Sequence, residues 1–553
     1  MRTFAHGLHL YLLILAVSVV TGCASTSTTL RLQQLTSGSQ DIANCRAFYT
    51  ELEQQIDTAQ VRDSQTQAIA QFPYLHVDRF LATYKPEPTQ TVKFMAWLEQ
   101  SRQRALRTQN IEWQNLPAEN KTKLLQTTQS LFGYQANVLT QLQNCSTLLI
   151  RQELSDNAMR QSVYQNAVVT SDYQTWQRIA GFYVVTALPI AIGIHRWHED
   201  STQTLQQPYQ SHSFKGKALR YLPQQPQPTI DSAEAAALIK QAGNNPLGIP
   251  QLTSVLTPKQ RATLFARYAP VIEVDTISDN DRPGAPYLDT HAHAHVDTGK
   301  PVVYTLLSYT LFAGKVLPQF NYVIWFPART CESGVDLLCG NMDGITWRVT
   351  VADNGEPLQY DTIHNCGCYH TFFPTSQLVK RPQPGSLEEW AFTPIEAPAL
   401  KTGQRMLLTL SSGDHHIVSL NPTDNNDHTQ RQTITYTFED YDTLRSLPLT
   451  STVKTNKQLD DIKRKSLFGN DGIIAGTERG ERYLFWPMGI PSPGAMRQWG
   501  HHATAFVGRR FFDDPCLLET YYTPALSTVK LHGSFRAPTL RDQYCSAPHN
   551  DDP

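Results

Sequence analysis

Apolar residues at helical spacing mark the first third of the chain. Phe94, Leu98 and Leu106 recur at multiples of four residues, which places their side chains on one face of a helix. Pro73 and the Pro-Glu-Pro stretch at 86–88 interrupt this pattern, and proline breaks helices. We therefore predict a helical region of several separate helices over residues 31–215.

Short runs rich in β-branched and aromatic residues replace this pattern in the second half. They cover residues 302–312, 322–326, 347–351, 406–410, 417–420, 433–438 and 504–507. Asn354-Gly355 separates one run from a weaker one at 358–363 and predicts a hairpin turn. We predict an α+β fold: the helical region, a connecting segment over 216–285, a β-rich and mostly antiparallel domain over 286–545, and a disordered tail over 546–553.

One later stretch, residues 180–194, is strongly apolar. It has fifteen residues and contains Pro189 and two glycines, so it is short for a membrane span. A buried helix or a pair of strands is the preferred interpretation. A segment that dips into a membrane is the alternative.

The N-terminus has the three parts of an export signal. Arg2 precedes an apolar run at 8–20, and residues 20–23 read Val-Thr-Gly-Cys. Small residues before a cysteine resemble the lipobox of bacterial lipoproteins. The resemblance covers only residues 1–23. It implies that the signal at 1–22 is removed and that Cys23 carries acyl chains such as palmitate, followed by a flexible tether over 23–30. An ordinary cleaved signal is the alternative.

This resemblance also implies an address. A membrane-anchored envelope protein facing the periplasm is expected, and the absence of Asp at position 24 points to the outer membrane. The formal net charge is −2 and the sequence has no basic run, so charge gives no indication of nucleic-acid binding. The sequence contains no nucleophile elbow, Walker loop, dinucleotide fingerprint or His-Glu-x-x-His motif. These absences argue against the common serine hydrolases, nucleotide enzymes and zinc proteases.

Eight cysteines follow Cys23. An even number in an exported chain predicts disulfides, although eight cysteines allow 105 pairings. Proximity along the chain suggests three bridges: Cys45–Cys145, Cys331–Cys339 and Cys516–Cys545. Cys366 and Cys368 are then left over.

The sequence Leu-Asp-Thr-His-Ala-His-Ala-His-Val-Asp at 288–297 is the first candidate metal site. On a strand, His291, His293 and His295 would share one face with Asp289 and Asp297. Alternate residues lie about 7 Å apart, so two of the three imidazoles could bind one metal ion. Asp289 or Asp297 would orient them or act as a general base. An exposed polar edge is the alternative.

The sequence His-Asn-Cys-Gly-Cys-Tyr-His at 364–370 is the second candidate. If the segment is extended, His364, Cys366, Cys368 and His370 share a face, and all four suit zinc or copper. In an oxidising compartment the two cysteines could instead form disulfides with distant partners, which would leave two ordinary histidines.

Two functions follow from these patterns. The first is a membrane-anchored periplasmic metal-binding protein, with zinc preferred over copper and His364 or His370 completing the ligand set. Metal-assisted hydrolysis would be its simplest reaction. The second is a non-catalytic interaction or assembly lipoprotein, stabilised by disulfides, with a protein partner in the envelope.

Overall fold

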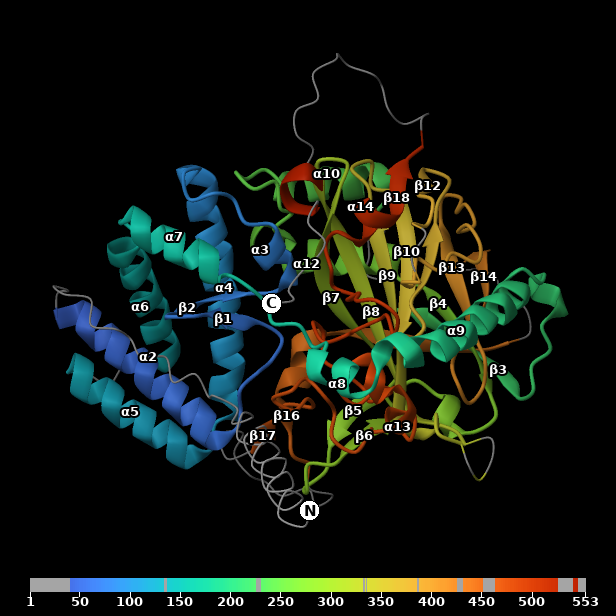
Figure 1. Cartoon of the computed structure of the whole chain (residues 1–553), viewed down its shortest axis with the longest axis horizontal. Coiled ribbons are helices and arrows are strands. Elements are labelled where there is room, and N and C mark those ends of the chain that lie inside the picture. The colour runs from blue at the N-terminus through green and yellow to red at the C-terminus, as the bar shows by residue number, and fades with distance from the viewer. Residues whose placement is uncertain are drawn as a thin grey trace, which may run out of the picture.

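The computed structural model describes residues 40–133, 137–224, 230–331, 334, 336–384, 387–424, 431–450, 463–525 and 541–545. Helices gather at one side of the molecule and a large sheet fills the other (Figure 1). The predicted α+β fold is confirmed. The predicted signal peptide, Cys23, the tether and the tail at 546–553 lie outside the described residues.

The helical part is a bundle with a small hairpin inserted after its first helix. Gly133, at φ +71°, ends helix α5 because glycine accepts the left-handed conformation. Pro86 and Pro88 lie between α3 and α4, as the proline pattern predicts. The elements are α2 (Gln40–Ala59), β1 (Gln67–Ile69), β2 (Phe72–Val77), α3 (Arg79–Thr83), α4 (Thr91–Asn115), α5 (Ala118–Phe132), α6 (Val138–Glu153) and α7 (Asn157–Asn166).

Ten strands form the large sheet, in the order β11-β10-β9-β8-β7-β15-β3-β4-β13-β14. Six neighbouring pairs are antiparallel and three are parallel. A mostly antiparallel sheet is therefore confirmed. The strands are β3 (Lys217–Pro223), β4 (Val271–Thr276), β7 (Val302–Phe312), β8 (Lys315–Arg329), β9 (Gly340–Val351), β10 (Pro357–His364), β11 (Thr371–Pro374), β13 (Gln404–Leu410), β14 (Ile417–Asp424) and β15 (Gln432–Asp440).

Residues 216–285 do more than connect the two parts. They supply β3 and β4, inside the sheet, and the helices α10 (Ser232–Ala242) and α12 (Pro258–Tyr268) that pack beside it. Charges inside these strands obscure their pattern, because Arg220 on β3 pairs with Glu273 on β4 at 3.1 Å and both are buried. The sheet thus begins at residue 217 rather than at 286.

Alternation along β8 builds a core on each face of the sheet. Phe320, Tyr322 and Ile324 belong to the core beneath α12, whereas Val323 and Trp325 belong to the core on the other face. Asn354-Gly355 does form the turn between β9 and β10, with Gly355 at φ +76°. The predicted strand at 504–507 is wrong, since that segment is a loop that follows an isolated bridge at Ala503.

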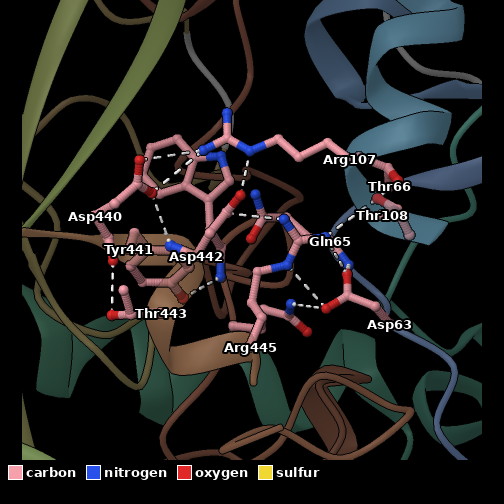
Figure 2. Close-up of polar contacts among 12 residues, drawn as sticks. Asp63, Gln65, Thr66, Arg107, Thr108, Asp440, Tyr441, Asp442, Thr443 and Arg445 are labelled. Atoms are coloured by element: carbon pink, nitrogen blue, oxygen red, sulfur yellow. Dashed lines mark hydrogen bonds and ion pairs between the residues drawn. The ribbon is translucent and has the colours of Figure 1, made fainter. Parts of the chain in front are cut away.

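A buried polar contact joins the helical part to the sheet part (Figure 2). Arg445 donates hydrogen bonds from Nη2 and Nε to the two carboxylate oxygens of Asp63, at 2.7 and 2.9 Å. Asp63 also accepts a hydrogen bond from Gln498, and Asn115 donates to the Arg445 carbonyl at 2.8 Å. These four hydrogen bonds therefore bridge distant parts of the chain.

Three disulfides occur in the described residues: Cys45–Cys145, Cys331–Cys339 and Cys516–Cys545. They are the three bridges that proximity suggests. The first joins α2 to α6 and closes the helical bundle. Within the described ranges, no helix is long and apolar enough to cross a membrane.

Candidate functional site

The predicted histidine strand at 288–297 is instead a hairpin. Strand β5 (Ala285–Leu288) turns into β6 (Ala294–Asp297), and Ala292 in the turn has φ +63°. The Asp289 carboxylate accepts the backbone N–H groups of His291 and His293, at 2.8 and 2.9 Å. These hydrogen bonds lower the pKa of Asp289 to about 2, and the bond from the His293 N–H contributes most. Asp289 therefore stabilises the turn.

The side chains of this hairpin stand in solvent. His293 and His295 approach the Asp289 carboxylate at 3.3 and 3.5 Å, and their side chains are 73% and 45% exposed. Asp297 pairs with Lys300 at 3.1 Å. In the part of the chain that the structure describes, no three His, Cys, Asp or Glu side chains are arranged to hold a metal ion. The predicted ligand set is not assembled.

The segment 364–370 is a turn between β10 and β11, not an extended strand. The His364 N–H donates to the Cys368 carbonyl at 3.0 Å, and Gly367 lies at φ +93°. His370 points away to Asp361, with Nε2 2.9 Å from Oδ2, and Arg348 donates to the same carboxylate. Burial lowers the pKa of His370 to about 3. The predicted common face of His364 and His370 does not exist.

The two cysteines of this turn are free. Each of the other six described cysteines lies in one of the three disulfides. The predicted bridges from Cys366 and Cys368 to distant cysteines are therefore wrong. Cys366 is 3% exposed, and Cys368 is partly exposed.

His364 lies in a buried polar cluster at the end of β10. It is 2% exposed, and neither ring nitrogen has a hydrogen-bond partner among the described residues. Its Nδ1 is 3.8 Å from Asp343, too far for a hydrogen bond. The His416 and Tyr369 rings lie 4.6 and 5.0 Å from the His364 ring. Burial lowers the pKa of His364, which favours the neutral ring.

Asp343, on β9, is the carboxylate at the centre of the charged residues in this cluster. It accepts hydrogen bonds from Arg479 at 3.0 Å and from His415 at 2.8 Å. Burial opposes its charge, but Arg479 and the neighbouring imidazoles hold the pKa of Asp343 well below its usual value. His415 in turn lies 3.5 Å from Asp281 and stacks on Phe326. This ion network fixes the geometry around His364.

Backbone strain gathers at the same place. Met342, Tyr369 and His415 all have positive φ, at 53°, 63° and 54°. Such conformations cost about 1–3 kcal/mol each in non-glycine residues and concentrate at functional sites. Each strained residue lies next to a member of the cluster, namely Asp343, Cys368 or His416. The cluster is thus the best candidate for a chemical site in the described chain.

Helix α9 (Tyr183–Leu205) covers this cluster with its second half. The Trp197 ring lies 5.0 Å from that of Tyr369, and His198 stacks on Phe392 at 4.0 Å. A groove of about 610 Å³ runs along α9 from Ala191 to Gln203, and its other wall is formed by Lys380, Gln383 and residues 387–393.

The first half of α9 forms a second feature, an apolar face shared with α8 (Thr175–Ala180), α13 (Arg482–Phe485) and the short helix η5 (Trp486–Met488). These elements lie together along one side of the sheet part (Figure 1). The predicted burial of residues 180–194 is wrong: they are helical but on the surface. The apolar face consists of Trp176, Ile179, Phe182, Val184, Val185, Leu188, Ile192, Tyr483, Leu484 and Trp486, each at least 37% exposed.

Close packing holds the apolar face in shape. A Cβ atom at Gly181 would lie 2.4 Å from Cβ of Pro487, so only glycine allows α8 and η5 to meet there. Gln174 donates its N–H to the Gly489 carbonyl at 2.7 Å, and Arg178 donates to the Met488 carbonyl at 2.9 Å. Segments 300 residues apart in sequence therefore present one surface.

Arg479 and Asp343 escape sequence-based prediction because neither lies in a recognisable motif: Asp343 is an isolated charge, and Arg479 is one of four charged residues between positions 478 and 482. The positive φ angles of Met342, Tyr369 and His415 could not be predicted either, because none of these residues is a glycine. No family model matches the chain, and neither a curated protein nor a solved structure shows detectable similarity to it.

Proposed function

We propose that this protein is a disulfide-stabilised lipoprotein of the cell envelope that lies on a bilayer surface through its apolar face. One observation carries the proposal. Ten of the twenty large apolar side chains that are exposed in the described chain fall in this one face. Soluble monomers rarely expose a contiguous apolar surface of this kind unless it contacts a partner or a membrane.

The charge around the face favours a bilayer over a protein partner. Between residues 176 and 194 the only charged residue is Arg178. No Asp or Glu lies in that stretch. At the margins, Arg196 and Arg482 stand beside Glu199 and Glu481. Aromatic rings beside basic side chains suit the interface between acyl chains and anionic headgroups.

The proposed lipid anchor and the apolar face have separate roles. Cys23 precedes Gln40 by 17 residues. A segment of this length, fully extended, reaches at most about 60 Å. That reach is close to the diameter of a compact protein of this size, so an anchor alone would leave the orientation of the protein free. The apolar face supplies the orientation.

No metal-dependent reaction is part of this proposal. His293 and His295 stand in solvent, and His370 is held by Asp361. Of the two functions that the sequence suggests, the positions of these histidines favour the second, a non-catalytic interaction lipoprotein stabilised by disulfides. Its partner here is the bilayer itself.

Quenching of tryptophan fluorescence by lipids with brominated acyl chains tests the face. Trp176 and Trp486 are the exposed tryptophans of the described chain, at 62% and 37%, and both belong to the face. We expect vesicles of phosphatidylglycerol and phosphatidylethanolamine to quench the acylated protein, and Val184→Asp to reduce that quenching severalfold. Val92→Asp is the matched control, because Val92 is similarly exposed but lies on α4. Equal quenching of both variants would overturn the proposal.

Mass spectrometry of the mature N-terminus tests the anchor independently. Acyl chains on Cys23 are the expected result. An unmodified N-terminus, or cleavage elsewhere, contradicts the lipoprotein assignment.

A further inference from the structure

The two free thiols are the feature that a stabilising role does not explain. Beside three disulfides, the structure has Cys366 and Cys368 as free thiols two residues apart in one turn. No other described cysteine is available to either of them. Their only possible intramolecular partner in the described chain is each other.

The turn holds the two sulfurs together. Arg497 donates its Nε–H to the Cys366 carbonyl at 3.1 Å and its backbone N–H to the Asn365 carbonyl at 2.9 Å. A Cβ atom at Gly367 would lie 2.9 Å from the Ala503 carbonyl oxygen, so the residue between the cysteines has no room for a side chain. Residues two apart in such a turn have Cα atoms about 5–7 Å apart, which overlaps the range of disulfides.

The environment makes the two sulfurs different. A hydrogen bond from the Cys368 thiol, and then the Arg479 charge, lower the pKa of Cys366. The same hydrogen bond, with burial, raises the pKa of Cys368 well above its usual value. Cys366 is almost fully buried, whereas Cys368 reaches the surface. The pKa values of the two thiols are thus shifted in opposite directions, and Cys368 is the more exposed residue of the pair.

We propose that Cys366 and Cys368 are a redox-active pair that exchanges a disulfide with dithiol peptides or proteins. In the oxidised form a substrate thiolate attacks Sγ of Cys368. The bond between the two cysteine sulfurs breaks, and its electron pair stays on Cys366 as a thiolate beside Arg479. A low pKa favours this leaving group.

The second half of the exchange releases the substrate. The second thiol of the substrate gives a proton to water and then attacks the substrate sulfur of the mixed disulfide. This attack expels Cys368, which takes up a proton. The substrate is oxidised from dithiol to disulfide, and the cysteine pair gains two electrons. A disulfide-bearing partner reoxidises the pair by the reverse steps.

Titration with reduced and oxidised glutathione tests the pair in the full mature chain. Free thiols are blocked by alkylation, and the peptide that contains residues 366–368 is weighed. We expect a two-electron conversion that removes two hydrogens from this peptide while the Cys331–Cys339 bridge stays oxidised throughout. A pair that stays reduced at every glutathione ratio in the folded protein overturns the proposal.

Single variants test the assignment of the two sulfurs. Either substitution removes the hydrogen bond between the two thiols, so the difference in exposure decides the rates. Cys366→Ser should therefore accumulate glutathione on the more exposed Cys368 at least about tenfold faster than Cys368→Ser accumulates it on the buried Cys366. The reverse order would overturn the mechanism. Near-ultraviolet circular dichroism checks that both variants fold. If one of them does not fold, the glutathione titration of the unmodified chain decides whether the proposal stands. The test needs no membrane, so its outcome is independent of the proposed bilayer contact.

Discussion

The guanidinium of Arg445 and the carboxylate of Asp63 form a two-pronged ion pair across 382 residues of sequence. Both side chains are almost fully buried, at 1% and 2% exposure. A buried ion pair that loses one partner leaves an uncompensated charge, which costs about 3–5 kcal/mol. The contact therefore couples the stability of the helical part to that of the sheet part.

Arg445→Met is expected to lower the free energy of unfolding by about 3–5 kcal/mol. Urea denaturation followed by circular dichroism measures it. Lys123→Met is the control, since Lys123 pairs with Glu119 on an exposed face of α5 and such pairs contribute under about 1 kcal/mol. A loss of similar size in both variants would refute the coupling role of Arg445.

Disulfides that close loops of different length should differ in their stabilisation. The Cys45–Cys145 bridge spans 100 residues and the Cys331–Cys339 bridge spans 8. Loop-closure entropy gives about 4.7 kcal/mol for the first and about 2.5 kcal/mol for the second. Replacing each pair by alanines and comparing the urea midpoints measures the difference. If the short bridge proves the more stabilising, loop entropy is not the cause.

Acid should destabilise the protein through His370. Burial lowers the pKa of this side chain to about 3, so below pH 6.5 the unfolded chain binds a proton that the folded chain does not. The stabilisation is complete above pH 6.5 and is lost as the pH falls toward 3, by about 1.4 kcal/mol per pH unit. His370→Gln retains a donor for Asp361 but cannot titrate. Unfolding measured between pH 6.5 and 4.5 should show a slope shallower by one proton, and an unchanged slope would count against this assignment.

Gly181 should be required for the shape of the apolar face. In Gly181→Ala the new Cβ atom would overlap Pro487, which we expect to cost about 1–3 kcal/mol and to weaken binding to vesicles. Gly193→Ala is the matched change, because no atom lies within 4 Å of its Cβ position on α9. That variant should gain about 0.5–1 kcal/mol from helix propensity. Thermal unfolding and vesicle sedimentation separate the two outcomes.

Local sequence patterns were sufficient to predict much of the fold. Proline positions and helical spacing predicted the helix bundle, Asn354-Gly355 predicted a turn, and proximity predicted all three disulfides. Strands β3 and β4 were missed because their pairing is long-range and the buried pair Arg220–Glu273 hides their apolar character. The hairpin at β5 and β6 was missed because alternation alone does not reveal where a chain turns.

The candidate site was predicted only in part. His364, Cys366 and Cys368 stood out because their residue types are rare together. Asp343 and Arg479 contribute through contacts across 136 residues of sequence, which no local pattern records. Exposure is equally non-local: the apolar residues at 180–194 resemble a core segment until the rest of the fold leaves them uncovered.

Strand β15 closes the large sheet, because its first half pairs with β3 and its second half with β7. The chain is synthesised from its N-terminus, so residues 432–440 emerge after the other nine strands of this sheet. Until then the sheet exists as two pieces, each with an unpaired edge that invites aggregation. A polypeptide truncated before residue 432 would keep both open edges, whereas one truncated after residue 525 has the complete sheet. The last strand of the sheet to be synthesised thus sets how long the growing chain keeps these two edges unpaired.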